Sequence, residues 1–289
     1  MSRTLLTGGL ALSALLSVAA VVPAQAALTQ AAPAGAGVVD IAHRGSSGSA
    51  PENTVAAIEY AVDQRASFVE VDVQRSADGE LVLIHDTTLA RTTNVEEVFP
   101  DRAPWNVGDF TLAELKQLDA GTWFSEDFAG EPVPTLREGI EALGSTGLLL
   151  EFKAPELYPG IEAEIHEEVS SIPGYLDRAL RTGRYVAQSF NIESMRTYHE
   201  IAPEVPVGLL YGSRPSDEVL VEASEWADQI NPSQTVTDQA LVDRVHELGM
   251  TISVYTLNTG QLMRRFIDLG VDGIITDYPG VLHDILRNS

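Results

Sequence analysis

The chain reads VEVDV at residues 69–73 and LVLIH at residues 81–85. Asp78-Gly79 lies between the two runs, and Asp-Gly between apolar runs is a strong signal for a β-hairpin. If these two residues form the centre of the turn, the numbers of paired residues sum to 157. This register places Asp72 opposite His85. The sequence therefore predicts an antiparallel hairpin whose first strand carries acidic side chains.

Side chains two positions apart on a strand share one face of the sheet. We therefore expect Glu70, Asp72 and His85 to project together from the hairpin. The valines of the first strand should project the other way, together with Val82 and Ile84. Valines on one face and acids on the other are typical of a barrel strand whose outer face packs under helices.

Short β-branched runs alternate with longer amphipathic runs from Val38 onward. Strands that alternate with helices predict a parallel sheet. Apart from the second run of the hairpin, the candidate strands are Val38–Ala42, Val69–Val73, Leu148–Lys153, Val186–Phe190, Val207–Tyr211, Gln229–Asn231, Thr251–Thr256 and Gly273–Thr276. Eight such strands in roughly 250 residues indicate an α/β fold, the TIM (β/α)8 barrel. The alternative is an open doubly wound sheet, but the first strand-to-helix loop, residues 43–48, lacks the G-x-G-x-x-G fingerprint.

A long stretch, Asp86–Pro134, separates the hairpin from the next strand–helix unit. It contains one expected helix, Thr111–Leu118. A stretch of this length inside a compact fold is usually a functional lid or a binding insert. We therefore expect one domain over residues 38–289, a barrel with an inserted lid segment of about residues 86–134 after the hairpin.

Residues 1–26 have the pattern of a secretory signal peptide: one basic residue, an apolar stretch and an A-x-A exit. The alternative is an uncleaved membrane anchor, because the apolar run approaches spanning length. The small residues at its exit favour cleavage. Residues 27–37 are rich in Ala, Gly and Pro and are typical of a flexible lead-in. We therefore expect a secreted protein without a stable membrane anchor.

The composition limits the classes of partner. The chain has 18 Lys and Arg against 42 Asp and Glu, a formal net charge of −24, and no cysteine. A surface this acidic repels nucleic acid and anionic membranes but suits divalent cations. The absence of cysteine excludes disulfides, thiolate zinc sites and a cysteine nucleophile. We therefore expect no nucleic-acid partner, and we expect a monomer.

Acidic residues also mark another candidate strand, where Glu151 and Lys153 share a face. In a barrel, the carboxyl ends of different strands converge on one mouth. Carboxylates of Glu70, Asp72 and Glu151 gathered there would repel one another unless a cation neutralised them. A ligand set made only of oxygens selects Mg²⁺ or Ca²⁺. The alternative, that each acid is an ordinary exposed residue, fits poorly with acids that alternate with valine inside a strand.

Basic side chains lie at the same strand ends. His43 and His85 would flank the metal as an acid/base pair. Arg44 and Lys153 add cationic donors, and with the metal they make an anion site suited to a phosphate.

Several short blocks occur in an order that is highly specific as a set. They are His43-Arg44-Gly45, Pro51-Glu52-Asn53-Thr54, Glu70-Val71-Asp72-Val73, Leu83-Ile84-His85-Asp86, Arg91-Thr92-Thr93-Asn94, Pro134-Thr135-Leu136, Glu151-Phe152-Lys153, Gln188-Ser189-Phe190 and residues 270–279, GVDGIITDYP. Together they cover nearly all of residues 38–289. In them the chain closely resembles the glycerophosphodiester phosphodiesterase family in its secreted bacterial form.

The resemblance implies a TIM barrel with an inserted lid that hydrolyses glycerophosphodiesters to glycerol 3-phosphate and an alcohol. It also implies one bound divalent cation, Ca²⁺ or Mg²⁺, with Ca²⁺ slightly preferred. By position, Glu70, Asp72 and Glu151 would be metal ligands, and His43 and His85 the catalytic pair.

The same resemblance implies that Arg44 and Lys153 hold the phosphate and that Phe190 and Tyr255 lie beside the glycerol moiety. Many members of the family have tryptophan at the position of Tyr255. Tyrosine keeps an aromatic wall but adds a hydroxyl, so this departure bears on substrate preference and not on the chemistry.

Three other functions compete with this interpretation. An exolytic hydrolase of poly(glycerol phosphate), the teichoic-acid backbone, would use the same site. A phospholipase D-like enzyme acting on lysophospholipids or sphingolipids would need an apolar entrance. A non-catalytic binding protein would lack catalytic residues, and none of the residues that the resemblance implies is missing here.

Overall fold

The computed structural model describes residues 37–288 together with Met1. The predicted signal peptide, residues 1–26, and most of the predicted lead-in, residues 27–37, lie outside the described residues. Both therefore stay predictions. Within the described part, none of the helices combines the length and the apolar character needed to cross a membrane.

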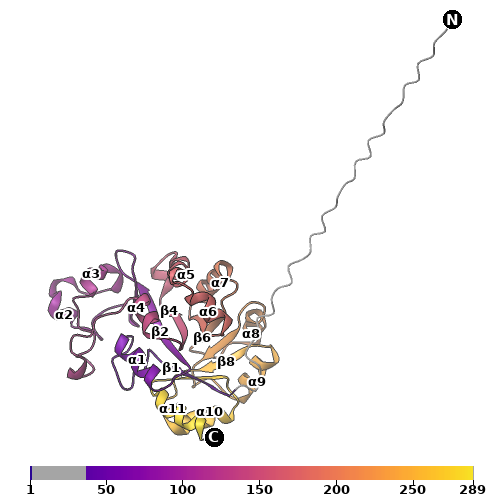
Figure 1. Cartoon of the computed structure of the whole chain (residues 1–289). Helices are drawn as coiled ribbons and strands as arrows, with labels where there is room; N and C mark the ends of the chain where they lie inside the picture. Colours follow the sequence, from indigo (N-terminus) through magenta and orange to yellow (C-terminus); the bar gives the residue numbers. More distant parts are fainter. Residues whose placement is uncertain (2–36, 289) are drawn as a thin grey trace.

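Eight parallel strands form a closed barrel in the described part of the chain (Figure 1). They pair in the order β1-β9-β8-β7-β6-β5-β4-β2, and β1 also pairs with β2, which closes the ring. The strands are β1 (Val39–Ala42), β2 (Phe68–Arg75), β4 (Gly147–Phe152), β5 (Tyr185–Ser189), β6 (Val207–Tyr211), β7 (Gln229–Pro232), β8 (Thr251–Val254) and β9 (Gly273–Thr276). The predicted TIM (β/α)8 barrel is confirmed, and closure rules out the open doubly wound sheet.

Helices follow the strands and cover the outside of the barrel (Figure 1). They are α1 (Val55–Asp63), α4 (Leu136–Ala142), α5 (Ile161–Ser171), α6 (Tyr175–Arg181), α7 (Ile192–Ile201), α8 (Asp217–Ala223), α9 (Gln239–Glu247), α10 (Gly260–Asp268) and α11 (Pro279–Arg287). Polar N-caps explain where several of them begin: the side chains of Thr54, Asn191 and Asp238 each accept a hydrogen bond from the first turn. The sequence did not predict α6.

The main hydrophobic core lies between the strands and this layer of helices. The valines of residues 69–73 are buried in it, as are Leu148 and Leu150 of β4. The alternate residues of the same strands point into the barrel, where Leu149, Ile41 and two others form a small separate cluster. This alternation confirms the predicted split of β2 into an apolar outer face and an acidic inner face.

The register of the hairpin differs from the prediction by one residue. Strand β3 (Leu81–Leu83) pairs with β2 so that Val73 lies opposite Leu83, and paired numbers sum to 156. The loop has three residues, because Ser76 N donates to Glu80 O, and its last residue, Gly79, has a φ of +91°. Three-residue hairpin loops place a glycine in this left-handed conformation. The predicted two-residue turn is therefore wrong.

A shift of one residue moves every side chain of a strand to the other face. Leu81 and Leu83 join the valines of β2 in the main core, whereas Val82 and Ile84 pack with residues 86–134. The prediction that Val82 and Ile84 share the valine face is therefore wrong. Asp72 lies opposite Ile84, whose N donates to Asp72 O, and not opposite His85. His85 follows the end of β3.

The segment between β3 and α4 has a core of its own. Its short elements are α2 (Val95–Val98), η1 (Pro100–Arg102), η2 (Val107–Asp109), α3 (Leu112–Leu115) and η3 (Glu126–Phe128). Figure 1 shows α2 and α3 together at one side of the barrel. The predicted helix Thr111–Leu118 is present as the shorter α3, which Thr111 caps. Val82, Ile84 and buried apolar residues of this segment form its core.

Candidate active site

Three buried carboxylates meet inside the barrel. Glu70 and Asp72 lie on β2 and Glu151 on the adjacent β4, where it pairs with Asp72 in the sheet. Their side chains face inward, and the residues are 1 %, 1 % and 6 % exposed. One oxygen from each lies within 4.8 Å of the others. The structure thus brings the three predicted metal ligands together from two strands.

The electrostatics of this cluster favour a bound cation. Burial raises the pKa of Glu70 well above its ordinary value and that of Glu151 to about 7, and nearby carboxylates add to both shifts. Burial also acts on Asp72, but the positive charges of Lys153 and Arg44 outweigh it and lower the pKa of Asp72. Carboxylates held this closely titrate together unless a further positive charge offsets their repulsion.

The donor atoms fit a hard metal ion. Glu70 Oε1 and Asp72 Oδ1 are buried and accept no hydrogen bond, although Lys153 Nζ lies 3.4 Å from Asp72 Oδ1. Buried polar atoms are normally satisfied, so orphaned carboxylate oxygens facing one another indicate a missing partner. Because all the donors are oxygens, the cluster suits a cation such as Ca²⁺ or Mg²⁺.

Arg44 and Lys153 line this cluster with positive charge. The backbone N of Arg44 donates to Glu70 Oε2 at 2.8 Å, and its Nε lies 3.5 Å from Asp72 Oδ2. Lys153 Nζ donates to Glu151 Oε1 at 2.6 Å. The two cations balance only part of the charge of the three acids.

The loop after β1 adopts a conformation that a side chain would disturb. Arg44 has a φ of +54° and Gly45 a φ of +80°. A Cβ on Gly45 would lie 2.6 Å from the backbone of Ala57, so only glycine fits there. Asn53 also has a positive φ, +57°. Strained backbone in the loop that carries the predicted phosphate ligand is typical of functional sites.

Asn53 holds one member of the acidic cluster, Asp72, by two hydrogen bonds. Its Nδ2 donates to Asp72 Oδ2 at 2.8 Å, and its Oδ1 accepts from Asp72 N at 3.0 Å. Thr54, not Asn53, caps α1. The sequence analysis gave no signal for the contact between Asn53 and Asp72.

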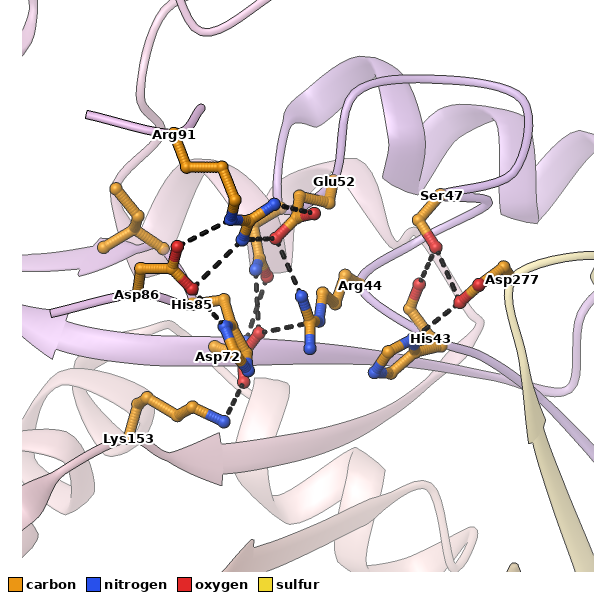
Figure 2. A network of polar contacts seen from close by, with 12 residues as sticks. His43, Arg44, Ser47, Glu52, Asp72, His85, Asp86, Arg91, Lys153 and Asp277 are labelled. Carbon is orange, nitrogen blue, oxygen red and sulfur yellow. Dashed lines mark hydrogen bonds and ion pairs between the residues drawn. The ribbon is translucent and has the colours of Figure 1, made fainter. Parts of the chain in front are cut away.

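His43 is oriented by an acid from the other end of the chain. Its Nδ1 lies 2.6 Å from Asp277 Oδ1, at the end of β9 (Figure 2). Asp277 also accepts hydrogen bonds from Ser47 Oγ and Asn258 Nδ2. Burial opposes its ionisation, but these hydrogen bonds and the nearby His43 leave the pKa of Asp277 below its ordinary value. A carboxylate at Nδ1 leaves Nε2 for chemistry.

His85 has the same kind of partner. Its Nδ1 lies 2.7 Å from Asp86 Oδ1, and Arg91 binds the same carboxylate (Figure 2). The hydrogen bond from Arg91 is the main cause that lowers the pKa of Asp86 to about 2. Burial lowers the pKa of His85 itself, although the charge of Asp72 opposes the shift. His85 is therefore neutral over a wider pH range than a free imidazole.

The backbone that carries His85 is fixed from inside the hairpin. Gln74 is fully buried, and its Nε2 lies 2.8–3.1 Å from the carbonyl oxygens of three successive residues, Ile84, His85 and Asp86. Its Oε1 accepts a hydrogen bond from the hydroxyl of Tyr158. Thus His85 reaches the site although it lies outside the ladder, because this amide holds the chain where β3 ends.

A small cavity of about 190 Å³ joins these groups. Its walls are His43, Arg44, Glu70, His85, Glu151, Lys153, Gln188, Phe190, Leu210, Tyr255, Thr256 and Ile275. They include every predicted site residue except Asp72, which belongs to the acidic cluster. The two predicted catalytic histidines therefore face one cavity and not two.

The aromatic side of the cavity is built by Phe190 and Tyr255. Their ring centroids are 6.0 Å apart in an edge-on arrangement, and Lys153 Nζ lies 5.7 Å from the ring of Phe190. The hydroxyl of Tyr255 donates to the carbonyl of Tyr211 at 3.1 Å. The hydroxyl that distinguishes this residue from tryptophan is therefore engaged by the backbone.

Sequence reasoning missed the two acids that orient the histidines. Asp86 and Asp277 both lie within the blocks that carried the resemblance, but no role was predicted for either. The signal that could have found them is their position, because each follows a strand end that bears or faces a histidine.

Comparison with known proteins places this geometry in context. Residues 43–281 match the model of the glycerophosphoryl diester phosphodiesterase family. The glycerophosphodiester phosphodiesterase of Bacillus subtilis is 33% identical over 265 residues, which is 86% of this chain and 87% of that protein. The glycerophosphodiester phosphodiesterase of Caldanaerobacter subterraneus is 38% identical over 252 residues, 86% of this chain and 98% of that protein.

Among solved structures, one similar fold is an Oleispira antarctica phosphodiesterase in complex with the product sn-glycerol-3-phosphate. The TM-score is 0.75 and the sequence identity 30%, over 86% of this chain and 96% of that chain.

Proposed function

The chain belongs to the glycerophosphoryl diester phosphodiesterase family and is a phosphoric diester hydrolase, and we propose that it cleaves glycerophosphodiesters to sn-glycerol 3-phosphate and an alcohol. One observation carries the proposal: two acid-paired histidines face a single cavity that also holds an orphaned carboxylate cluster and two cations. Hydrolysis of a phosphodiester needs three things: neutralisation of the phosphate charge, a general base and a general acid.

We propose that Glu70, Asp72 and Glu151 hold one divalent cation, Ca²⁺ or Mg²⁺, with Ca²⁺ slightly preferred. Their unpaired oxygens and close spacing support this assignment. When bound, such a cation acts as a Lewis acid that offsets negative charge on the phosphate.

Arg44 and Lys153 are positioned to bind the non-bridging phosphate oxygens. Both side chains are mostly buried, and charge-assisted hydrogen bonds are stronger in such surroundings than in water. On this proposal their ion pairs with the acids orient them, and the phosphate takes their remaining donors. Phe190 and Tyr255 would form the wall against which the glycerol moiety packs.

We propose that His43 and His85 act as the acid–base pair. Asp277 and Asp86 accept from the two Nδ1 atoms, so the Nε2 atoms are left to move protons. One histidine would deprotonate the nucleophile and the other would protonate the leaving alkoxide. Two nucleophiles suit this arrangement: water, or the glycerol 2-hydroxyl by way of a cyclic phosphate. Hydrolysis in ¹⁸O-labelled water with a search for the cyclic product distinguishes them.

The size of the cavity favours small substrates. About 190 Å³ accommodates a glycerophosphate group, whereas pockets that bury drug-sized ligands have about 300–1,000 Å³. We therefore place soluble glycerophosphodiesters ahead of lysophospholipids, whose acyl chain would need an apolar entrance, and of poly(glycerol phosphate).

A hydrolysis panel with metal-stripped enzyme tests the proposal. The substrates are glycerophosphocholine, glycerophosphoethanolamine, poly(glycerol phosphate) and lysophosphatidylcholine, each with Ca²⁺ or Mg²⁺ added back. Release of sn-glycerol 3-phosphate from the first two on metal addition is the expected result. Cleavage of only the polymer or only the lysolipid would replace the proposed substrate with one of these alternatives.

We also propose that the protein acts outside the cytoplasm, on the signal-peptide pattern of residues 1–26, and that it is a monomer. Mass spectrometry of secreted protein should find a new N-terminus after Ala26. Sedimentation of the mature protein should give the mass of one chain. An intact Met1 on the secreted protein would contradict cleavage of the signal peptide. The mass of a dimer would contradict the monomer.

A further inference from the structure

Arg91 joins two carboxylates that come from different parts of the chain. Its Nη1 and Nη2 each donate at 2.8 Å to one oxygen of Glu52, in the loop before α1. Its Nε donates at 2.6 Å to Asp86 Oδ2, and its Nη2 lies 3.1 Å from Asp86 Oδ1. Figure 2 shows the guanidinium group of Arg91 between Glu52 and Asp86. This is the bidentate geometry for which a guanidinium is suited and an ammonium is not.

Each of these carboxylates holds a residue of the proposed catalytic machinery. Glu52 accepts a hydrogen bond from Arg44 Nη1 at 2.9 Å, and Asp86 accepts from His85 Nδ1 at 2.7 Å. A continuous chain of hydrogen bonds therefore runs from Arg44 through Glu52, Arg91 and Asp86 to His85. Arg91 is its centre, and it comes from the segment between β3 and α4.

The partner of the other histidine is held differently. Asp277, which orients His43, is fixed by the neutral groups of Ser47 and Asn258, both in loops of the barrel itself. Asp86 receives side-chain hydrogen bonds from Arg91 and His85, and its side chain is 29 % exposed. Without Arg91, Asp86 would be a partly solvated carboxylate free to leave the imidazole.

We propose that Arg91 is a positioning residue for catalysis: it fixes Asp86, and thereby the ring and tautomer of His85, while it holds Glu52 against Arg44. The inference rests on the proposed function of the same site. Arg91 does not line the cavity, so it acts through the residues that do. It gives the segment between β3 and α4 a role in the site, because this segment supplies the residue that links Glu52 to Asp86.

Replacing Arg91 tests whether this residue positions His85 or binds the substrate, because the two roles affect kcat and KM differently. In Arg91→Met, which keeps the length of the stem, we expect kcat on glycerophosphocholine to fall about 10–100-fold, the range for lost outer-shell partners. KM should change less than kcat, because Arg91 itself contacts no substrate and Arg44 keeps its ion pair with Asp72. Arg91→Lys should recover only part of the activity, since an ammonium cannot bind two carboxylates as a fork. A raised KM with unchanged kcat would instead make Arg91 a substrate ligand, and wild-type values of both would also overturn the proposal.

A double-mutant cycle tests whether Arg91 acts through Asp86. If it does, Arg91→Met should lower kcat far less in an Asp86→Asn background than in the wild type. Additive losses in the double mutant would contradict the proposed route. Arg244→Met is the matched control, because Arg244 on α9 also bridges two carboxylates, Asp217 and Glu247, but neither of these carboxylates lines the cavity or accepts a hydrogen bond from either histidine of the site. Its kcat should equal that of the wild type.

A spectroscopic measurement keeps the proposal testable apart from turnover. Nitrogen NMR of ¹⁵N-labelled histidine reports the tautomer of each ring. Arg91→Met should reduce the Nδ1–H tautomer of His85 and leave that of His43 unchanged. An unaltered His85 signal would refute the positioning role even if the enzyme cleaved no glycerophosphodiester, whereas a changed signal together with no turnover by the wild type would refute the proposed substrate alone.

Discussion

The two ends of the barrel are built from opposite kinds of residue. The carboxyl ends of the strands hold the buried cluster of Glu70, Asp72 and Glu151. The amino ends surround a cavity of about 350 Å³ whose walls are largely apolar, with Ile41 and Val186 among them and with acidic residues on only part of its lining. Buried like charges oppose folding, whereas buried apolar surface drives it. We therefore expect the carboxyl ends to serve the proposed chemistry and the amino ends to serve mainly stability.

This difference has a measurable form. Substitutions at the carboxyl ends should lower activity while leaving or raising stability. Substitutions at the amino ends should lower stability while leaving the activity of the folded protein unchanged. Barrels of this type generally divide the two tasks in this way.

The histidines should show the largest effect. We expect His43→Ala and His85→Ala each to lower kcat by about 10²–10⁴-fold, the range for general acid–base catalysis. Both side chains are partly exposed, so the melting temperature should stay near that of the wild type. Steady-state kinetics at saturating metal and thermal unfolding provide the two readouts. Near-full activity of either variant would remove that histidine from the mechanism. A large loss of stability would contradict the expectation that the carboxyl ends do not contribute to stability.

Ile252 provides the opposite case at the amino end of β8. Its side chain is fully buried in the main core. Ile252→Ala should lower the free energy of unfolding by about 2–5 kcal/mol, and the control Ile252→Val by about 0.5–1.5 kcal/mol. Urea unfolding measures both. The kcat of the folded protein should not change, and a fall in kcat would show that the two ends are coupled.

Glu70→Gln should lower activity and raise the stability of the metal-free protein. Burial and the neighbouring carboxylates oppose ionisation of Glu70, and the substitution removes this cost, so melting in EDTA should occur at a higher temperature than for the wild type. The metal concentration needed for half-maximal activity should rise by at least about 10–100-fold, the loss expected for an outer-shell partner. An unchanged metal requirement would exclude Glu70 as a ligand.

Asp40, at the amino end of the barrel on β1, should make the free energy of unfolding depend on pH. Neither of its carboxylate oxygens has a hydrogen-bond partner, and burial raises the pKa of Asp40 to about 8. The folded protein therefore keeps a proton that the unfolded chain loses near pH 4. As a result the free energy of unfolding falls as the pH rises towards 8, by up to about 1.4 kcal/mol per pH unit.

Asp40→Asn removes this contribution. The difference in unfolding free energy between variant and wild type should grow from pH 5 to pH 8 and become constant above that range. Comparing the two proteins cancels the titration of the other acids. Parallel pH curves would show that Asp40 stays ionised in the folded protein.

The pattern of the sequence predicted much of this fold because alternation carries the information. Valines alternating with acids in β2 put the apolar side chains on one face and the acids on the other, so the inner position of Glu70 and Asp72 followed directly. The register of the hairpin did not follow. Asp78-Gly79 fits both a two-residue and a three-residue loop, and the backbone pairing of Ser76 with Glu80 decides between them.

The site was predictable to the same extent. The side chains that line the cavity lie at strand ends, where topology alone brings them together. The acids that orient them were not predicted, because Asp86 and Asp277 depend on how loops fold back after the strands. Arg91 was missed for the same reason, since its position follows from the packing of a segment with no regular pattern.

The contact between His43 and Asp277 spans 234 residues. Strands β1 and β9 bring the two together, and they are the first and the last strands of the barrel. During translation a nascent chain thus holds the imidazole of His43 for most of its synthesis without the carboxylate that aligns it. Loss of β9 through a premature stop or a proteolytic cut should therefore abolish activity and not only reduce it. Activity should appear only once β9 has paired with β1 and closed the barrel.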